Sequence, residues 1–337
     1  MFTLQTIWFL LLAVLFIGYA VLDGFDLGVG VLSVLAKDDN ERGRMVAAVG
    51  PFWDGNEVWL LTGGGAIFAA FPDVYATVFS GFYLALMLLL VALILRAVSV
   101  EFWGKVDSPG WRKAWGVGFF LGSLLPAILL GVAFGNILHG VPVDSTKEYA
   151  GTFFTLLNPY SVLVGVLSLV MFMMHGALYL TLRTDGQLRA KAIKWAGRGW
   201  AAFVALYVSV TALTAVFAGK MFARYMENPL PWILVVVAVA AIAAIKLFLN
   251  KELVGKAFIA SSLAIASLIG VAAVGLFPNL VPSTLDPAYS LTVMNSSNSQ
   301  LTLTVMLILV AIGVPIMLMY TAYIYHCFRG KSEAGEY

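Results

Sequence analysis

The chain has 337 residues, of which 61% are apolar and only 11% are Asp, Glu, Lys or Arg, and its formal net charge is +2. Soluble globular proteins carry about 25% charged residues, so this composition excludes an ordinary soluble domain and a basic surface for nucleic acid. The single cysteine, Cys327, also excludes a disulfide framework and a CxxCH haem attachment. We therefore expect an integral membrane protein that does not bind nucleic acid.

Nine stretches of the chain are apolar enough to cross the hydrocarbon core of a membrane, which takes about 20 residues as a helix. They cover residues 7–35, 50–71, 74–99, 114–138, 159–182, 199–222, 231–249, 255–278 and 301–327. The apolar runs are continuous and do not alternate with a period of two, so they predict helices and not a β-barrel. We expect one all-α integral membrane domain, in which residues 7–138 and 159–278 form two four-helix bundles and residues 301–327 an extra ninth helix.

The basic residues predict the orientation of these helices. Of the 20 lysines and arginines, 17 lie in or beside the connections after the odd-numbered stretches, and only Lys147, Lys220 and Arg224 lie on the other side. Because basic residues accumulate on the cytoplasmic side of a membrane, this bias places the N-terminus outside and the C-terminus in the cytoplasm.

The first stretch, which contains GYAVLDGFDLGVG, carries two acidic residues, Asp23 and Asp26. A charged residue at mid-bilayer costs about 2.5–3.5 kcal/mol on insertion scales, so it normally faces protein or water. The i, i+3 spacing puts the two carboxylates on neighbouring parts of one helix face, where they can share a proton. Gly24 and Gly28 form a small-xxx-small pair that lets another helix pack closely. A proton-holding role and a structural role both remain open.

The second stretch begins with GPFWDGNEVWLL at the cytoplasmic side, and Asp54 and Glu57 again have i, i+3 spacing with Asn56 between them. These three polar residues lie one or two turns below the cytoplasmic face, where water can enter. Together with the acidic pair of the first stretch, they place the carboxylates in one half of the membrane. That distribution is typical of a proton or cation inlet from the cytoplasm.

The third stretch ends with LILRAVSVEFWGK at the same side. Glu101 and Lys105 have the favourable i, i+4 order for an ion pair, although side chains that reach to the membrane surface explain them equally well. Arg96 lies about a turn and a half deeper. We expect Arg96 to pair with a buried carboxylate.

The three histidines, His139, His175 and His326, fall at three different depths, which argues against a haem held by two histidines of this chain. His175 lies among methionines and is expected to pack as a satisfied core residue. P-loop, Rossmann, zinc-protease and serine-hydrolase motifs in a usable context are missing from the sequence. Any redox centre is therefore expected on another subunit.

Five segments resemble subunit II of the cytochrome bd-type quinol oxidases, in order and over nearly the whole chain. They are GYAVLDGFDLGVG (18–30), GPFWDGNEVWLLTGGGAIFAAFPDVYATVFSGFYLAL (50–86), GSLLPAILLGVAFGNILHGVP (122–142), FFTLLNPYSVL (153–163) and LFPNLVPSTLDPAYSLTVMNSSNSQLTLTVM (276–306). The second segment is too long and idiosyncratic to arise from composition alone.

This resemblance implies two four-helix bundles plus a peripheral ninth helix, paired with a subunit I of similar fold. Such a complex oxidises quinol near the outer face and reduces O2 to water at haems b and d of subunit I. Protons for water come from the cytoplasm, which generates a proton motive force without a pump. The present chain would be the haem-free partner, multi-pass in a bacterial or archaeal cell membrane, in contact with lipid and the quinol pool. The resemblance leaves open whether a small accessory subunit is present and whether a quinone binds to this chain.

By the same resemblance, Asp54 matches a carboxylate that helps to deliver protons toward the haems. Asp26, Glu101 and Lys105 match positions near the same hydrophilic channel. Glu101 replaces an aspartate of some relatives, which keeps the acid but alters its reach. The sequence pattern adds Asp23 and Glu57 to this candidate proton pathway.

A quinone site in subunit II of some members has polar residues that match Arg96 and Asp26. The 223–230 connection here lacks a larger outer excursion of some relatives, so the resemblance supports proton delivery better than quinone binding. Arg96 and Asp26 are candidates for either a quinone site or a structural ion pair.

Two other functions fit the same residues. Intramembrane carboxylates and many glycines also occur in secondary transporters and cation channels, although no clear inverted pair of broken helices is present here. The second alternative is a purely structural scaffold, in which the acidic residues only pair with Arg96 and with helix ends.

Overall fold

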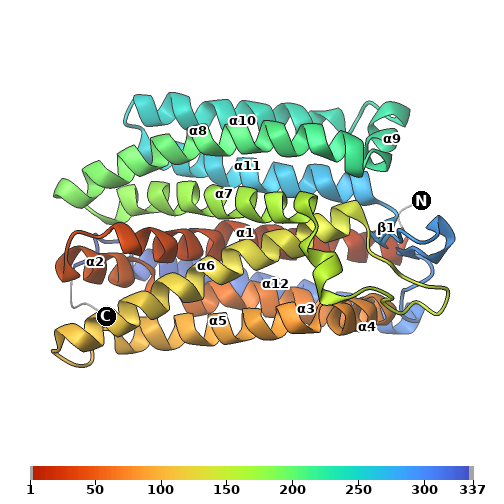
Figure 1. Ribbon diagram of the computed structural model, residues 1–337, viewed down its shortest axis with the longest axis horizontal. Coiled ribbons are helices and arrows are strands. Elements are labelled where there is room, and N and C mark those ends of the chain that lie inside the picture. The colour runs from red at the N-terminus through yellow and green to blue at the C-terminus, as the bar shows by residue number, and fades with distance from the viewer. Residues whose placement is uncertain (1–2, 334–337) are drawn as a thin grey trace.

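The computed structural model describes residues 3–333, and most of them belong to helices that run side by side (Figure 1). The long helices are α1 (Leu4–Leu32), α3 (Trp53–Ala70), α5 (Tyr83–Phe102), α6 (Pro109–His139), α7 (Pro159–Arg183), α8 (Gly186–Phe217), α10 (Trp232–Asn250), α11 (Val254–Leu276) and α12 (Gln300–Cys327). The shorter helices are α2 (Asp39–Val49), α4 (Pro72–Gly81) and α9 (Lys220–Glu227). We call the end with α2 and residues 328–333 the C-terminal end, and the opposite end, where the chain starts, the N-terminal end (Figure 1).

Eight helices of residues 3–333 are long and apolar enough to cross a membrane, so the chain is a multi-pass membrane protein. They are α1, α5, α6, α7, α8, α10, α11 and α12. The ninth predicted stretch, 50–71, is α3, which is not among the eight. Its first turns carry Asp54, Asn56 and Glu57, and these polar residues lower its hydropathy. That α3 crosses the membrane as well stays a prediction.

Several helix bounds differ from the predicted ones for physical reasons. The predicted stretch 74–99 is broken at Phe82, whose backbone is not helical, so that α4 precedes α5. Pro72 starts α4 because proline fits the first turn of a helix. The predicted stretch 199–222 begins earlier, at Gly186, because α8 continues beyond its apolar part into polar turns.

Two short antiparallel strands, β1 (Asn279–Val281) and β2 (Leu291–Thr292), are an exception to the all-α prediction. They lie between α11 and α12 at the N-terminal end (Figure 1). Ser299, at the end of the polar run before α12, caps that helix by accepting a hydrogen bond from the Thr302 amide. Serine is a preferred residue at this position because its side-chain oxygen accepts a hydrogen bond from a free amide of the first turn.

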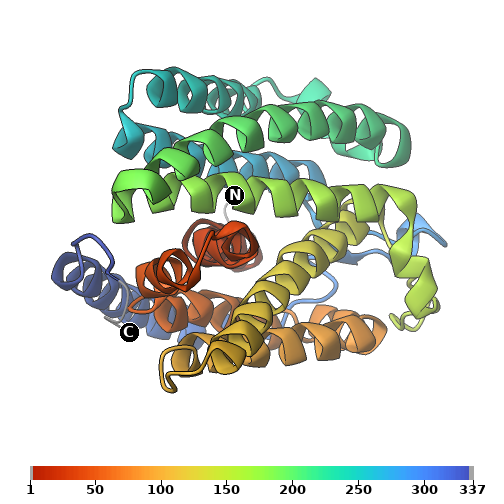
Figure 2. The same ribbon diagram turned by 60° about the vertical axis from the view of Figure 1, so that its left-hand side comes forward.

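Helix α1 occupies the centre of the molecule (Figure 2). α3, α5 and α6 lie on one side of it, and α7, α8, α10 and α11 lie on the other. α1 and α7 approach closely at Gly28 and Gly176, where a Cβ on Gly176 would lie 2.6 Å from the Gly28 carbonyl carbon. Close packing at this glycine pair is what the small-xxx-small pattern predicts. The division into two four-helix bundles stays a prediction.

Helix α12 lies on the outside and packs mainly against α3 and α1. Only 6% of its most apolar 18-residue window is buried, the lowest share of the eight apolar helices. Leu303, near its start, accepts a hydrogen bond from the Trp8 indole through its carbonyl oxygen at 3.0 Å. The helix is therefore attached at its ends more than along its length.

Residues 328–333, which we call the C-terminal segment, fold back from α12 onto the end of α7. The Ser332 amide donates to the Arg183 carbonyl oxygen at 2.7 Å. The Lys331 ammonium group donates to the carbonyl oxygens of Leu182 at 2.7 Å and Thr184 at 3.0 Å. These bonds satisfy carbonyl groups that a helix end leaves without an intrahelical partner.

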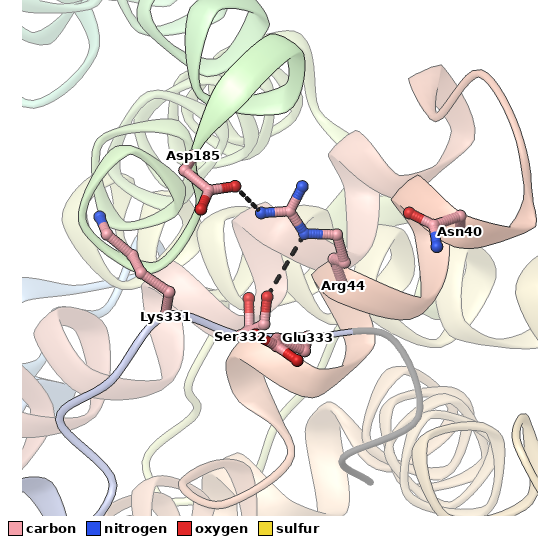
Figure 3. Close-up of a pocket in the computed structure, with 6 residues that line it drawn as sticks. All are labelled: Asn40, Arg44, Asp185, Lys331, Ser332 and Glu333. Carbon is pink, nitrogen blue, oxygen red and sulfur yellow. Dashed lines mark hydrogen bonds and ion pairs between the residues drawn. The ribbon is translucent and has the colours of Figure 1, made fainter.

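A polar cavity of about 340 Å³ lies beside this segment (Figure 3). In it, Arg44 of α2 extends between Asp185, with which it forms an ion pair, and the Ser332 carbonyl oxygen, to which Nε donates at 3.3 Å. The cavity thus results from α2, the α7–α8 connection and the C-terminal segment meeting at one place. Its acidic and basic groups largely pair with each other, so we do not consider it the functional site.

Candidate functional site

Four of the ionisable residues singled out from the sequence lie together inside the helices. Asp23 and Asp26 come from α1, Glu57 from α3 and Arg96 from α5, and we call these four residues the carboxylate cluster. Asp23, Asp26 and Arg96 are at most 1% exposed. The Glu57 side chain is 19% exposed, which makes it the one member in contact with the surface of the chain.

Arg96 joins two carboxylates from different helices. Its Nη1 lies 2.7 Å from Asp23 Oδ1, and its Nη2 donates to Glu57 Oε2 at 2.9 Å. The prediction that Arg96 pairs with a buried carboxylate is confirmed, and it pairs with two. A guanidinium group suits this position because it is planar, always charged and able to bind two acceptors at once.

Asp26 contacts an amide instead of the guanidinium. Its Oδ2 accepts a hydrogen bond from Asn56 Nδ2 at 2.7 Å, and Asn56 Nδ2 also donates to the Leu22 carbonyl oxygen at 3.3 Å. The Tyr325 hydroxyl, in the last turn of α12, donates to Asn56 Oδ1 at 3.0 Å. Sequence reasoning missed Tyr325, because an aromatic residue near the end of a membrane helix is normally read as an interface anchor.

The charges of the carboxylate cluster do not balance. Three carboxyl groups face one guanidinium group, so full ionisation would leave two uncompensated negative charges in a buried place. An unpaired buried charge is costly, and a bound proton removes that cost. Asp26 is the member without a contact to Arg96.

Some buried polar atoms around the cluster find no hydrogen-bond partner among residues 3–333. They include Asp26 Oδ1, Arg96 Nε and Trp59 Nε1. Buried polar atoms of this kind are normally satisfied by ordered water. Water at these atoms would give protons a medium through which they can exchange with the carboxylates.

Asp54 lies outside the cluster, on a face of α3 that is exposed in this chain. The other residues of that face are apolar, with Val58 40%, Leu61 70% and Phe68 59% exposed. Asp54 precedes Glu57 by three residues, so the two lie on adjacent parts of the helix. A carboxylate on an apolar membrane-helix face is costly in lipid, so this face is suited to contact with another protein.

Glu101 and Lys105 lie at the C-terminal end, also outside the cluster. Glu101 is half-buried in the last turn of α5, about 7.5 Å along the helix axis from Arg96. The helix ends at Phe102, and Lys105 is exposed in the turn that follows. Lys105 therefore lies beyond the end of the helix, and the ion pair of Glu101 with Lys105 stays a prediction.

The other side of α1 holds His175 of α7, which is fully buried. Its Nε2 donates to the Val21 carbonyl oxygen at 2.9 Å, its Nδ1 accepts from the Ser261 hydroxyl at 2.6 Å, and its ring stacks on Phe258. The prediction of a satisfied packing histidine is confirmed. With both ring nitrogens engaged, His175 does not fit a haem ligand. Within residues 3–333, no three or more His, Cys, Asp or Glu side chains are arranged to hold a metal ion.

At the C-terminal end, a further ion pair links α2 to α8. Glu41 accepts hydrogen bonds from the Lys191 ammonium group at 2.7 and 2.8 Å and from the Lys37 amide at 2.8 Å. Burial acts to raise the pKa of Glu41, but the bonds from Lys191 and Lys37 outweigh it, and the pKa lies below the usual value. This pair contributes to holding α2 and α8 together at the C-terminal end.

Comparisons with known proteins agree with each other over nearly the whole chain. A sequence model of the family described as cytochrome bd terminal oxidase subunit II matches residues 4–328. The chain is 42% identical to a probable cytochrome oxidase subunit 2 of Haemophilus influenzae, over 98% of this chain and 96% of that protein. It is 39% identical to the cytochrome bd-I ubiquinol oxidase subunit 2 of Escherichia coli K12, over 97% and 95%.

Two further comparisons extend this pattern. The cytochrome bd ubiquinol oxidase subunit 2 of Bacillus subtilis is 38% identical, over 100% of this chain and 99% of that protein. A chain of the solved bd oxidase from Geobacillus thermodenitrificans superimposes with a TM-score of 0.78 over 97% of this chain and 99% of that chain, at 19% identity. That structural likeness shows a shared fold.

Proposed function

This chain belongs to the cytochrome bd terminal oxidase subunit II family and is therefore a subunit of a respiratory quinol oxidase, and we propose that within this complex it delivers protons for oxygen reduction. The partner is a subunit I, which binds haems b and d, whereas this chain is haem-free. Quinol is oxidised near the outer face of a bacterial cytoplasmic membrane. Protons enter from the cytoplasm, where the C-terminal end lies, and the complex generates proton motive force without pumping.

The observation that carries this proposal is the carboxylate cluster with its single guanidinium group. A structural ion pair needs one carboxylate for each cation, whereas Arg96 faces both Asp23 and Glu57, and Asp26 lies beside them. An excess of buried acidic groups is typical of proton relays. A purely structural scaffold gives no reason for this excess.

The residues have distinct roles in the proposed pathway. Glu101 and Lys105, at the C-terminal end, lie where protons enter from the cytoplasm. Asp54 takes up the proton at the exposed face of α3, which we propose contacts subunit I. Glu57, adjacent to Asp54 and partly exposed, exchanges protons between that face and the buried members of the cluster. Asp23 and Asp26 hold the proton between turnovers.

A quinone site at Arg96 has less support. Both terminal nitrogens of the guanidinium lie within 3 Å of carboxylate oxygens, and the Arg96 side chain is only 1% exposed. A quinone carbonyl oxygen would have to displace one of these carboxylates. We propose that Arg96 is structural and electrostatic, and that it fixes the two carboxylates that it contacts.

An independent transporter or channel is not favoured by the family to which the chain belongs. The buried charged residues of this chain are also confined to one part of the molecule. Among residues 3–333, α7, α8, α10 and α11 contain no buried Asp, Glu, Lys or Arg. A transport pathway would need polar groups along its whole length.

Replacing Asp54 by Asn tests the proposed pathway. Asp54→Asn removes the proton-accepting group with little change of shape, so quinol-dependent O2 consumption should fall by about tenfold or more, the scale of positioned proton transfer. The reduced-minus-oxidised spectrum of the purified complex should show unchanged haem content.

Asp107→Asn is the matched control. Asp107 lies at the same end, its side chain is 93% exposed, and it pairs with Arg112 at the surface. We expect this variant to retain full turnover. Normal turnover in Asp54→Asn at normal haem content would contradict proton delivery through Asp54, and loss of haem would show that Asp54 serves assembly instead.

A further inference from the structure

The most exposed of the long helices reaches the carboxylate cluster through one side chain. Tyr325 lies in the last turn of α12, and its hydroxyl donates to Asn56 Oδ1 at 3.0 Å. Its ring packs against Phe52, with ring centroids 4.4 Å apart. The rest of α12 contributes little buried surface, so this contact is specific and not a consequence of general packing.

The contact stabilises one orientation of the Asn56 amide. The Leu22 carbonyl oxygen can only accept a hydrogen bond, so Asn56 Nδ2 is the atom that faces it, and the same Nδ2 lies 2.7 Å from Asp26 Oδ2. In that orientation Oδ1 points away from Asp26 and needs a donor, because Asn56 is only 1% exposed. The Tyr325 hydroxyl is that donor.

The position of Tyr325 is fixed by contacts that the residues after it form with the end of α7. On the C-terminal side, the amide of Ser332 and the ammonium group of Lys331 hold the C-terminal segment against the end of α7. Arg183 donates to the Phe328 carbonyl oxygen, and its guanidinium lies 5.3 Å from the centre of the Phe52 ring. These contacts fix the position of the last turn of α12 along the axis of α3.

We propose that Tyr325 is a positioning residue for Asp26: its hydroxyl holds the Asn56 amide N–H toward the carboxyl group and thereby lets Asp26 release its proton. This inference rests on the proposed function, in which Asp26 holds a proton between turnovers. It adds a residue of α12 to a pathway that otherwise involves only α1, α3 and α5.

The chemistry behind this role is the effect of a donor on a buried acid. A hydrogen bond donated to a carboxylate oxygen favours the ionised form, whereas a hydrogen-bond acceptor placed against a carboxyl group favours the protonated form. Without the Tyr325 hydroxyl, only the 3.3 Å hydrogen bond from Asn56 Nδ2 to the Leu22 carbonyl oxygen opposes a turn of the amide. Such a turn brings the Asn56 carbonyl oxygen toward Asp26, and that oxygen binds only a protonated carboxyl group. The titratable groups around Asp26 are Asp23 on α1, Glu57 on α3, Arg96 on α5, Tyr179 on α7 and Tyr325 on α12.

The first test is Tyr325→Phe in the intact oxidase complex. Phenylalanine keeps the ring that packs on Phe52 and removes only the hydroxyl. We expect the acidic limb of the turnover–pH profile to move to higher pH by about one unit, the effect of losing one hydrogen bond to a charged group. Haem content and the KM for quinol should not change. Tyr320→Phe is the matched control, because Tyr320 is on the same helix and 62% exposed, and its profile should not move.

A double-mutant cycle separates positioning from general packing. In the Asn56→Leu background the amide is gone, so Tyr325→Phe should produce no further shift of the pH profile. Infrared difference spectra should show a protonated carboxyl band that strengthens in Tyr325→Phe, and this band should be missing when Asp26 is replaced by Asn. A packing role would move neither the band nor the profile.

The outcomes distinguish this inference from the proposed function. If Asp26→Asn slows turnover but Tyr325→Phe leaves the profile in place, the role of Tyr325 is wrong and the pathway stands. If Tyr325→Phe still shifts the profile in the Asn56→Leu background, or if it prevents assembly, the role is also wrong. If neither Asp26→Asn nor Asp54→Asn affects turnover, the proposed function itself fails.

Discussion

The two sides of α1 pack against their neighbouring helices through different kinds of buried polar group, charged on one side and neutral on the other. Toward α3 and α5, its Asp23 meets the Arg96 guanidinium and the carboxylate cluster. Toward α7 and α11, the buried polar group is His175, which forms two hydrogen bonds to neutral partners, the Val21 carbonyl oxygen and the Ser261 hydroxyl. Helices of similar length are therefore held together without any buried charge on the second side.

This difference indicates what the charges are for. Replacing a buried ion pair by well-packed apolar residues is often neutral or stabilising, so buried charges are weak evidence of a stability role. The neutral side shows that this chain can pack membrane helices without them. The charges of the carboxylate cluster therefore support the proposed role in proton delivery, and the comparison can be tested by changing each side in turn.

The largest effect is expected from Arg96→Leu, on the charged side. This change leaves Asp23 and Glu57 without their cation, and breaking a buried pair from one side costs about 3–5 kcal/mol. We expect little assembled complex, measured as haem content per protein and as the temperature of thermal unfolding. Removing the opposing charge as well, in Asp23→Leu with Arg96→Leu, should recover part of the loss. Normal assembly of the single variant would show that the cluster is not held by this guanidinium.

A smaller effect is expected from His175→Leu, on the neutral side. The substitution leaves the Val21 carbonyl oxygen and the Ser261 hydroxyl without their partner, which costs about 1–3 kcal/mol. The temperature of thermal unfolding should fall, but the pH dependence of turnover should stay the same, since His175 takes no part in the pathway. A shifted pH profile would place a titrating group on the side that the comparison treats as neutral.

The smallest effect is expected from Glu41→Gln, which weakens the pair that links α2 to α8. Because the pKa of Glu41 is lowered in the folded chain, its stabilisation is present above the usual value near 4.5 and is lost as the pH falls through the lowered value. Partly exposed pairs contribute about 0.2–1 kcal/mol, so thermal unfolding at neutral pH should shift by only about 1–2 °C.

The control for Glu41→Gln is Asp39→Asn. Asp39 pairs with Arg42 within α2, so that pair does not connect two helices, and its loss should matter less. A difference between Glu41→Gln and the unchanged protein that persists at low pH would mean that shape, and not charge, is responsible.

Local rules predicted the parts of the molecule that depend on local sequence. Hydropathy located the apolar helices, and the cost of a buried charge predicted that Arg96 would meet a carboxylate. In each case the determining interaction lies within one helix or follows from the residue type alone.

The parts that were missed depend on how helices are rotated against each other. Asp54 and Glu57 have the same spacing as Asp23 and Asp26, but the first pair is divided between an exposed face and the cluster. The rotation of α3 against α1 decides this division, and no local pattern encodes it. The contact of Tyr325 with Asn56 joins residues 269 positions apart, so it follows only from the docking of α12.

The attachment of α12 by its two ends has a consequence for the order in which the site is completed. A chain is synthesised from its N-terminus, so α1, α3 and α5 are in place before α12 is made. The Tyr325–Asn56 bond forms only after α12 has inserted and the C-terminal segment has docked on the end of α7. Proton release from Asp26 is thereby linked to completion of the subunit. A partly synthesised chain would contain the carboxylate cluster but not Tyr325, the residue that positions the Asn56 amide against Asp26.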